Sequence, residues 1–123
     1  MSKSNSALVI AFIAVFLIGS AFGQHMNEKD SPCASVVITS NLTTCLSDAQ
    51  KTADGEMNLL YSDIRRRVNS RRDDLQRLVD AQRAWLKYRD ASCAAERDLY
   101  NGGTARWPAF YGCIEALTRQ RTH

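Results

Sequence analysis

The residues with the most distinctive chemistry in this chain are four cysteines: Cys33, Cys45, Cys93 and Cys113. They are separated by 12, 48 and 20 positions, so no C-x-x-C pair is present. A structural zinc site uses such close pairs and usually a nearby histidine. His25 and His123 both lie close to the ends of the expected domain. An even number of cysteines in a short exported chain is typical of disulfides. We therefore expect two disulfides, with no metal and no cofactor.

A second chemically distinctive group begins at Gln82. Gln82, Trp85 and Arg89 are spaced three and four apart, so they share one face of a helix. A buried arginine must meet a carboxylate or carbonyl groups, and the candidate partners are Asn58, Glu56 and backbone near the third helix. We favour an internal polar network. The alternative is a binding rim of the residue types enriched in hot spots. The residues assigned to this network or rim are Asn58, Tyr61, Gln82, Trp85, Tyr88, Arg89 and Asp90.

No catalytic set is visible in the sequence. There is no internal histidine to act as a base, and oxidised cysteines are not nucleophiles. No Gly-rich phosphate loop is present. Asp73 and Asp74 could do acid–base chemistry, but a favourable place at a helix N-terminus explains them more simply. The sequence therefore predicts a protein that is not an enzyme.

The elements that must position these side chains are helices. From about residue 41, apolar or small residues recur at steps of three or four, which is the period of an α-helix. This stripe consists of Leu42, Leu46, Ala49, Ala53, Met57, Leu60, Ile64 and Val68. The stripe keeps its phase across Gly55, so we expect one long helix that could bend there.

A chain reversal is expected around residues 69–72, and a continuous helix is the alternative. The arginines at 65–67 favour a helix C-terminus, although they could also form a binding patch. A second helix is expected over residues 73–99, ended by Gly102-Gly103. Pro108 suits the first turn of a third helix. The expected fold is all-α: a long antiparallel helical hairpin with a short third helix over its open end, stapled by disulfides.

Hairpin geometry favours one disulfide pairing. With a reversal near residue 69, facing positions have numbers that add up to about 138, as Cys45 and Cys93 do. The preferred pairing is therefore Cys45 with Cys93 and Cys33 with Cys113. The alternative pairs Cys33 with Cys93 and Cys45 with Cys113.

The first 23 residues have the layout of a secretory signal peptide. Lys3 precedes an unbroken apolar run of 12 residues, and small residues follow at the expected cleavage site after Gly23. A transmembrane anchor is the alternative, but the run is shorter than the ~20 residues that span a bilayer.

Cleavage leaves 100 residues with 15 basic and 13 acidic side chains. This small excess does not favour a nucleic acid or an anionic membrane as partner. Residues 24–40 are expected to form a flexible leader, and residues 41–121 the helical domain.

The order of motifs resembles the LprI-type lysozyme-inhibitor N-terminal domain family. The matching elements are Cys33 and Cys45, Met57-Asn58-Leu59-Leu60-Tyr61, Gln82 to Cys93, Gly102-Gly103-Thr104, Cys113, and Leu117-Thr118-Arg119-Gln120-Arg121. The resemblance covers residues 33–121 and implies a small exported bacterial helical protein. For some members it implies inhibition of lysozyme. The chain differs from lipoprotein-type members because it has no cysteine directly after the apolar run.

Two functions follow as hypotheses for a periplasmic or secreted protein. The first is a binding module that inhibits lysozyme or another cell-wall hydrolase. Its contacts would need a local acidic surface, and the candidates on the first helix are Asp48, Asp54, Glu56 and Asp63. The second is an envelope interaction protein without an enzyme target, using the aromatic residues Trp107, Phe110 and Tyr111.

Overall fold

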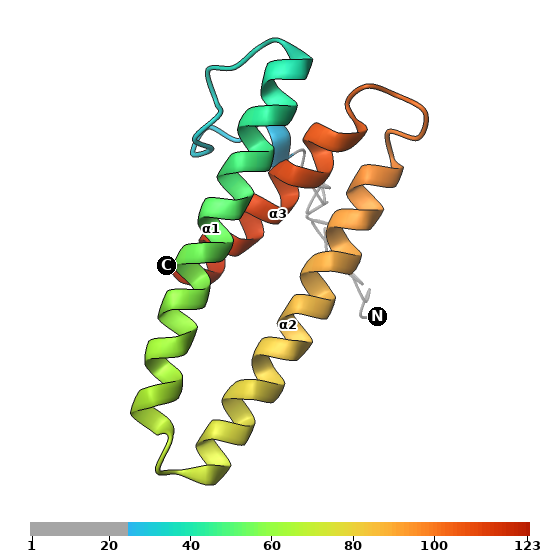
Figure 1. The fold of residues 1–123 in the computed structure, drawn as a ribbon. Coiled ribbons are helices and arrows are strands. Elements are labelled where there is room, and N and C mark those ends of the chain that lie inside the picture. The colour runs from blue at the N-terminus through green and yellow to red at the C-terminus, as the bar shows by residue number, and fades with distance from the viewer. Residues whose placement is uncertain (1–24) are drawn as a thin grey trace, which may run out of the picture.

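The computed structural model describes residues 25–123, and within them three α-helices follow a short 3-10 turn (Figure 1). The elements in chain order are η1 (His25–Asn27), α1 (Thr39–Val68), α2 (Arg72–Asp98) and α3 (Arg106–Thr122). The prediction of an all-α hairpin with a third helix is confirmed. The expected signal peptide, residues 1–23, lies outside the described residues. No helix in the described part of the chain combines the length and apolar character needed to cross a membrane.

Helices α1 and α2 form the predicted antiparallel hairpin. They are joined by a tight turn at residues 69–71 and diverge towards the opposite end (Figure 1). Asp73 and Asp74 occupy the first turn of α2, and Arg65, Arg66 and Arg67 occupy the last turn of α1. Both sets of charges are favourable for the helix dipole at those ends. The chain reversal predicted from the charge pattern is therefore confirmed.

Helix α3 lies more centrally than predicted. It was expected to fold over the open end of the hairpin. It packs against both α1 and α2, whereas α1 and α2 contact each other at few positions. Ala109 and Ala116 on α3 are fully buried, and these small side chains allow α1 and α2 to approach it closely. The core therefore lies at the open end of the hairpin. Beyond the end of α3 the predicted apolar stripe of α1 is less buried, and Leu60 is 40% exposed.

The segment before α1 differs from the flexible leader expected for residues 24–40. Met26, Ser31 and Cys33 are buried, and η1 packs against α3. The approach is close at Gly112, where an added Cβ would lie 2.7 Å from the Cα atom of Met26. The described part of this segment is therefore a packed part of the fold. No local sequence pattern indicated this, because the contacts are with residues far along the chain.

Both expected disulfide pairings are wrong. The bonds are Cys33–Cys45, which ties the leader to α1, and Cys93–Cys113, which ties α2 to α3. The hairpin argument assumed that α1 and α2 face each other directly at the open end. Because α3 packs between them there, Cys93 meets the cysteine of α3, and Cys45 meets the leader.

We predict that tryptic mapping of the unreduced protein will distinguish these pairings. No lysine or arginine lies between Cys33 and Cys45, so their bond should stay within the single peptide 30–51. Peptides 90–97 and 107–119 should be joined to each other by the second bond. A mass-spectrometric product that joins all three peptides would contradict the observed connectivity, since either hairpin pairing would produce it.

A second prediction concerns the close contact at Gly112. In Gly112→Ala the new methyl group would overlap the backbone of Met26, so we expect a loss of roughly 1–3 kcal/mol in the free energy of unfolding. The matched control is Gly55→Ala, because nothing lies within 4 Å of a Cβ added there. Removing a helical glycine should stabilise the protein by about 0.5–1 kcal/mol. Chemical denaturation of both variants would test this, and equal effects would refute the close packing of η1 on α3.

Candidate functional site

Arg89 on α2 is a buried cation at the point where the three helices meet. Its Nη1 donates to Asp54 Oδ1 on α1 at 2.7 Å and to Thr118 Oγ1 on α3 at 3.1 Å. Its Nε and Nη2 donate to Asp90 Oδ1 at 3.0 and 2.9 Å. Arg89 is only 8% exposed. Two carboxylates and a hydroxyl therefore compensate a charge that would be costly to bury alone.

The partners of Arg89 differ from those expected from the sequence. Neither Asn58 nor Glu56 binds it, and both are exposed. The carboxylate that reaches it from α1 is Asp54. The sequence placed Arg89 on an inward face. Which acidic residue of α1 reaches it depends on the rotation and offset of α1 relative to α2, and both are set by packing against α3.

Trp85 lies within cation–π distance of two guanidinium groups. Arg89 is 5.3 Å from the centre of its ring system, and Arg121 of α3 is 5.5 Å away. Both distances are within the range of cation–π attraction. Trp85 therefore belongs to the junction between α2 and α3, in line with its half-buried position.

The other residues of the expected polar group divide into buried and exposed members. Gln82 is buried and lies with its Nε2 3.4 Å from the sulfur of Met57. Tyr61 is half-buried and packs under Arg65 at 5.7 Å. Tyr88 is 59% exposed, and Asn58 is also exposed. The structure therefore brings Gln82, Trp85 and Arg89 to one side of α2, and the exposed Asp90 binds Arg89 from its edge. Asn58 and Tyr88 face solvent.

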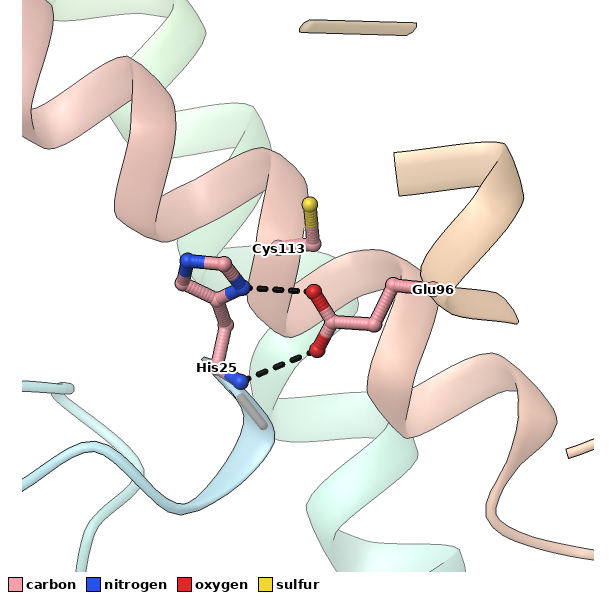
Figure 2. A group of neighbouring side chains, drawn as sticks. All are labelled: His25, Glu96 and Cys113. Atoms are coloured by element: carbon pink, nitrogen blue, oxygen red, sulfur yellow. Dashed lines mark hydrogen bonds and ion pairs between the residues drawn. The ribbon is translucent and has the colours of Figure 1, made fainter. Parts of the chain in front are cut away.

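A second polar group fastens the leader to α2 (Figure 2). The Nδ1 atom of His25 lies 2.6 Å from Glu96 Oε2, and its backbone N–H donates to Glu96 Oε1 at 3.0 Å. Sequence reasoning missed this contact, because His25 looked like a residue at a loose end. The nearest signal was Glu96 itself, an acidic residue on the inward side of α2.

His25, Glu96 and Cys113 are close enough to suggest metal ligands, since their donor atoms lie within 4.8 Å of one another. The sulfur of Cys113 is bonded to Cys93, however, and a metal-binding cysteine must be a thiolate. His25 and Glu96 also bind each other directly (Figure 2). These contacts indicate that the group has a structural role: His25 and Glu96 bind each other, and Cys113 is part of a disulfide.

Arg119 on α3 lies between two carboxylates of different segments. It donates from Nε to Glu115 Oε1 at 2.9 Å and from Nη2 to Glu28 Oε2 at 2.9 Å. The hydrogen bond to Glu115 holds the pKa of Arg119 above its usual value. The spacing of Glu115 and Arg119 by four residues could have suggested this pair, but no sequence pattern indicated that Glu28 would join it.

Beside this pair, a cleft of about 210 Å³ lies between the leader, α1 and α3. Its lining residues are Pro32, Ala49, Thr52, Ala53, Glu56, Glu115, Arg119 and His123. Glu115 is 2% exposed, and its Oε2 atom accepts no hydrogen bond from any described residue. A buried carboxylate oxygen that accepts no hydrogen bond is unusual, and this makes it a candidate contact point for a bound group.

Aromatic residues gather at the start of α3. The rings of Trp107, Phe110 and Tyr111 lie 5.7–6.1 Å apart in stacked and edge-on arrangements. Phe110 and Tyr111 are partly buried against the core, whereas Trp107 is 47% exposed. The group is therefore mainly structural, with one accessible ring.

The acidic residues of α1 that were expected to form a surface are mostly engaged. Asp48 pairs with Lys51, Asp54 with Arg89, and Asp63 with Arg66 and Arg67. The hydrogen bond from Arg67 holds the pKa of Asp63 below its usual value. Glu56 forms no ion pair within residues 25–123, and it lines the cleft.

Comparison with known proteins gives a family for this chain. A family model described as "Lysozyme inhibitor LprI" matches residues 32–123. A protein of Rhizobium meliloti (strain 1021), "Uncharacterized protein R02472", is 27% identical over 109 residues, which covers 80% of this chain and 78% of that protein. No solved structure matches the chain.

We predict that Arg89→Met destabilises the protein by roughly 2–3 kcal/mol. Removal of the cation leaves the hydroxyl of Thr118 buried without its partner, while Asp54 and Asp90 keep some access to water and soften the loss. The matched control is Arg66→Met, since Arg66 is exposed and its partner Asp63 retains Arg67. This variant should lose less than about 1 kcal/mol. Equal midpoints in urea denaturation would contradict a central role for Arg89.

Proposed function

The chain belongs to the LprI lysozyme inhibitor family, and on this premise we propose that it is an exported binding module that inhibits lysozyme or a related peptidoglycan hydrolase. The observation that carries the proposal is the family match, which extends over residues 32–123 and thus over nearly all of the expected mature chain. The family is described as a lysozyme inhibitor family, and we infer the same role for this protein.

The architecture supports binding better than catalysis. All four cysteines are in disulfides, so none is a nucleophile. The same two bonds, together with Arg89, fix the leader and the three helices relative to one another. A surface that is already ordered loses less conformational entropy when it binds, which favours tight association.

The sequence supports a periplasmic or secreted location. Disulfides persist in oxidising compartments, and residues 1–23 have the layout of a cleavable signal peptide. A hydrolase of the cell wall acts in the same compartment. An inhibitor placed there would meet its target without crossing a membrane.

A second candidate function is an envelope interaction protein with no enzyme target. The observation in its favour is the exposed ring of Trp107 at the edge of the aromatic group of α3. Tryptophan is enriched among residues that dominate binding energy. Capture of proteins from an envelope extract would distinguish the two functions, because a hydrolase partner favours the first and a structural partner the second.

We predict that the exported protein, purified with its disulfides intact, slows the lysis of bacterial cell walls by a basic lysozyme. Inhibition should rise with dose and approach completion at a modest molar excess. The readout is the turbidity of a cell-wall suspension over time. Unchanged lysis at a large molar excess would remove the proposal.

Two controls distinguish inhibition of the enzyme from protection of the cell walls and from effects that do not need the folded protein. Walls incubated with the protein and then washed should lyse normally, since the expected target is the enzyme and not the substrate. Protein that has been reduced and alkylated should lose inhibition, because the leader and α3 would no longer be held in place.

A further inference from the structure

We propose that the cleft between the leader, α1 and α3 receives one cationic side chain, a lysine or an arginine, of the inhibited enzyme. This inference rests on the proposed function and deepens it, because it names a contact site and the chemistry of the group that enters. Four features of the cleft carry it: charge, an unpartnered oxygen, size and rigidity.

The charge in and beside the cleft is negative on a chain that is basic overall. Glu56 and Glu115 line it, and Glu28 binds the Arg119 guanidinium at its side. Three carboxylates thus lie in or beside the cleft against one guanidinium, which already pairs with Glu28 and Glu115. Glu56 remains without an ion pair among the described residues. The field of these groups attracts a cation and disfavours an anion.

The unpartnered oxygen shows where the cation would bind. Glu115 Oε1 accepts from Arg119, but its Oε2 atom is buried and accepts no hydrogen bond from the described residues. An ammonium or guanidinium group supplies N–H donors and a positive charge together, so it forms the stronger, charge-assisted type of hydrogen bond. Glu115 lines the cleft, but Oε2 is closed to solvent, so the carboxyl group must turn before a cation in the cleft can reach this oxygen.

Size and lining restrict the ligand to one side chain. The volume of about 210 Å³ is below the ~300 Å³ at which pockets for drug-sized molecules begin. The walls at Pro32, Ala49 and Ala53 are apolar, which suits the aliphatic stem of lysine or arginine while its head reaches a carboxylate. A sugar ring, by contrast, would place hydroxyl groups against these apolar walls.

The walls of the cleft are held in place before binding. Pro32 is adjacent to Cys33, whose disulfide to Cys45 fixes that wall to α1 one turn before Ala49. On the other side, Glu28 fixes Arg119 of α3. The partner would therefore not have to order the site, which favours affinity.

The first test uses n-butylguanidinium chloride as a mimic of the arginine side chain, with n-butanol as its neutral counterpart. In ¹H–¹⁵N spectra of the wild-type protein, n-butylguanidinium should shift the amide signals of Thr52, Glu56 and Arg119, and n-butanol should not. Glu56→Lys and Glu115→Gln should weaken this response. If n-butylguanidinium shifts no amide of the cleft, the cation site is refuted whatever happens with lysozyme.

The second test measures inhibition of wall lysis by the same variants. Glu56→Lys puts a cation at the mouth and Glu115→Gln removes the buried charge, so we expect inhibition to weaken about tenfold to a hundredfold, the range of a charge-assisted hydrogen bond. The control is Asp48→Lys, which makes the same charge change on α1 outside the cleft and should stay within about twofold of wild type. Glu56 is exposed, so its substitution remains informative even if Glu115→Gln folds poorly.

The outcomes separate this inference from the proposed function. If the wild-type protein inhibits lysis and the cleft variants inhibit equally well, the cleft is not the contact site and the inference is wrong, while the function stands. If n-butylguanidinium binds but the wild-type protein does not inhibit lysis, the cation site is supported and the lysozyme-inhibitor function is wrong.

Discussion

The guanidinium of Arg89 binds side chains of both other helices, and the packing of the three depends on that junction. Helices α1 and α2 contact each other at few positions, so their relative placement is set through α3 and through this cation. Asp54 comes from α1 and Thr118 from α3. A buried charge tolerates only arrangements that supply its partners. Arg89 therefore disfavours any register of the hairpin that moves Asp54 or Thr118 away from it.

The disulfides complete this arrangement by joining separate segments within the core. Cys33–Cys45 fixes the leader on α1, and Cys93–Cys113 fixes α2 on α3. A domain of this size buries a limited apolar area and gains from such cross-links. The contact of His25 with Glu96 and the close approach at Gly112 secure the start of the described chain on the same helices. Every described element is thereby connected to α1 or α3.

The same network shapes the surface that a partner would meet. Most carboxylates of α1 pair with nearby basic side chains, and five arginines, at positions 65–67, 71 and 72, lie near the turn of the hairpin. A small acidic cleft lies beside the middle of α1, between the leader, α1 and α3. This distribution reconciles a net positive chain with a proposed basic target, because the sign of the local field, not the total charge, decides which group can bind there.

The sequence by itself determined the local features of this protein. The 3.6-residue stripe predicted α1 to within about two residues, since that period depends only on neighbouring positions. The charge pattern located the turn, and the spacing of Gln82, Trp85 and Arg89 placed them on one face. The even number of cysteines predicted two disulfides, and the motif order predicted the family.

Only the tertiary structure decided which distant residues meet. The disulfide pairing, the choice of Asp54 over Glu56 as partner of Arg89, and the packing of His25 all depend on α3 lying between α1 and α2. The cleft has the same origin, because its walls come from three separate segments. Periodicity fixes the face of a helix, but not its rotation or offset against another helix, and a shift of one turn changes every such partner.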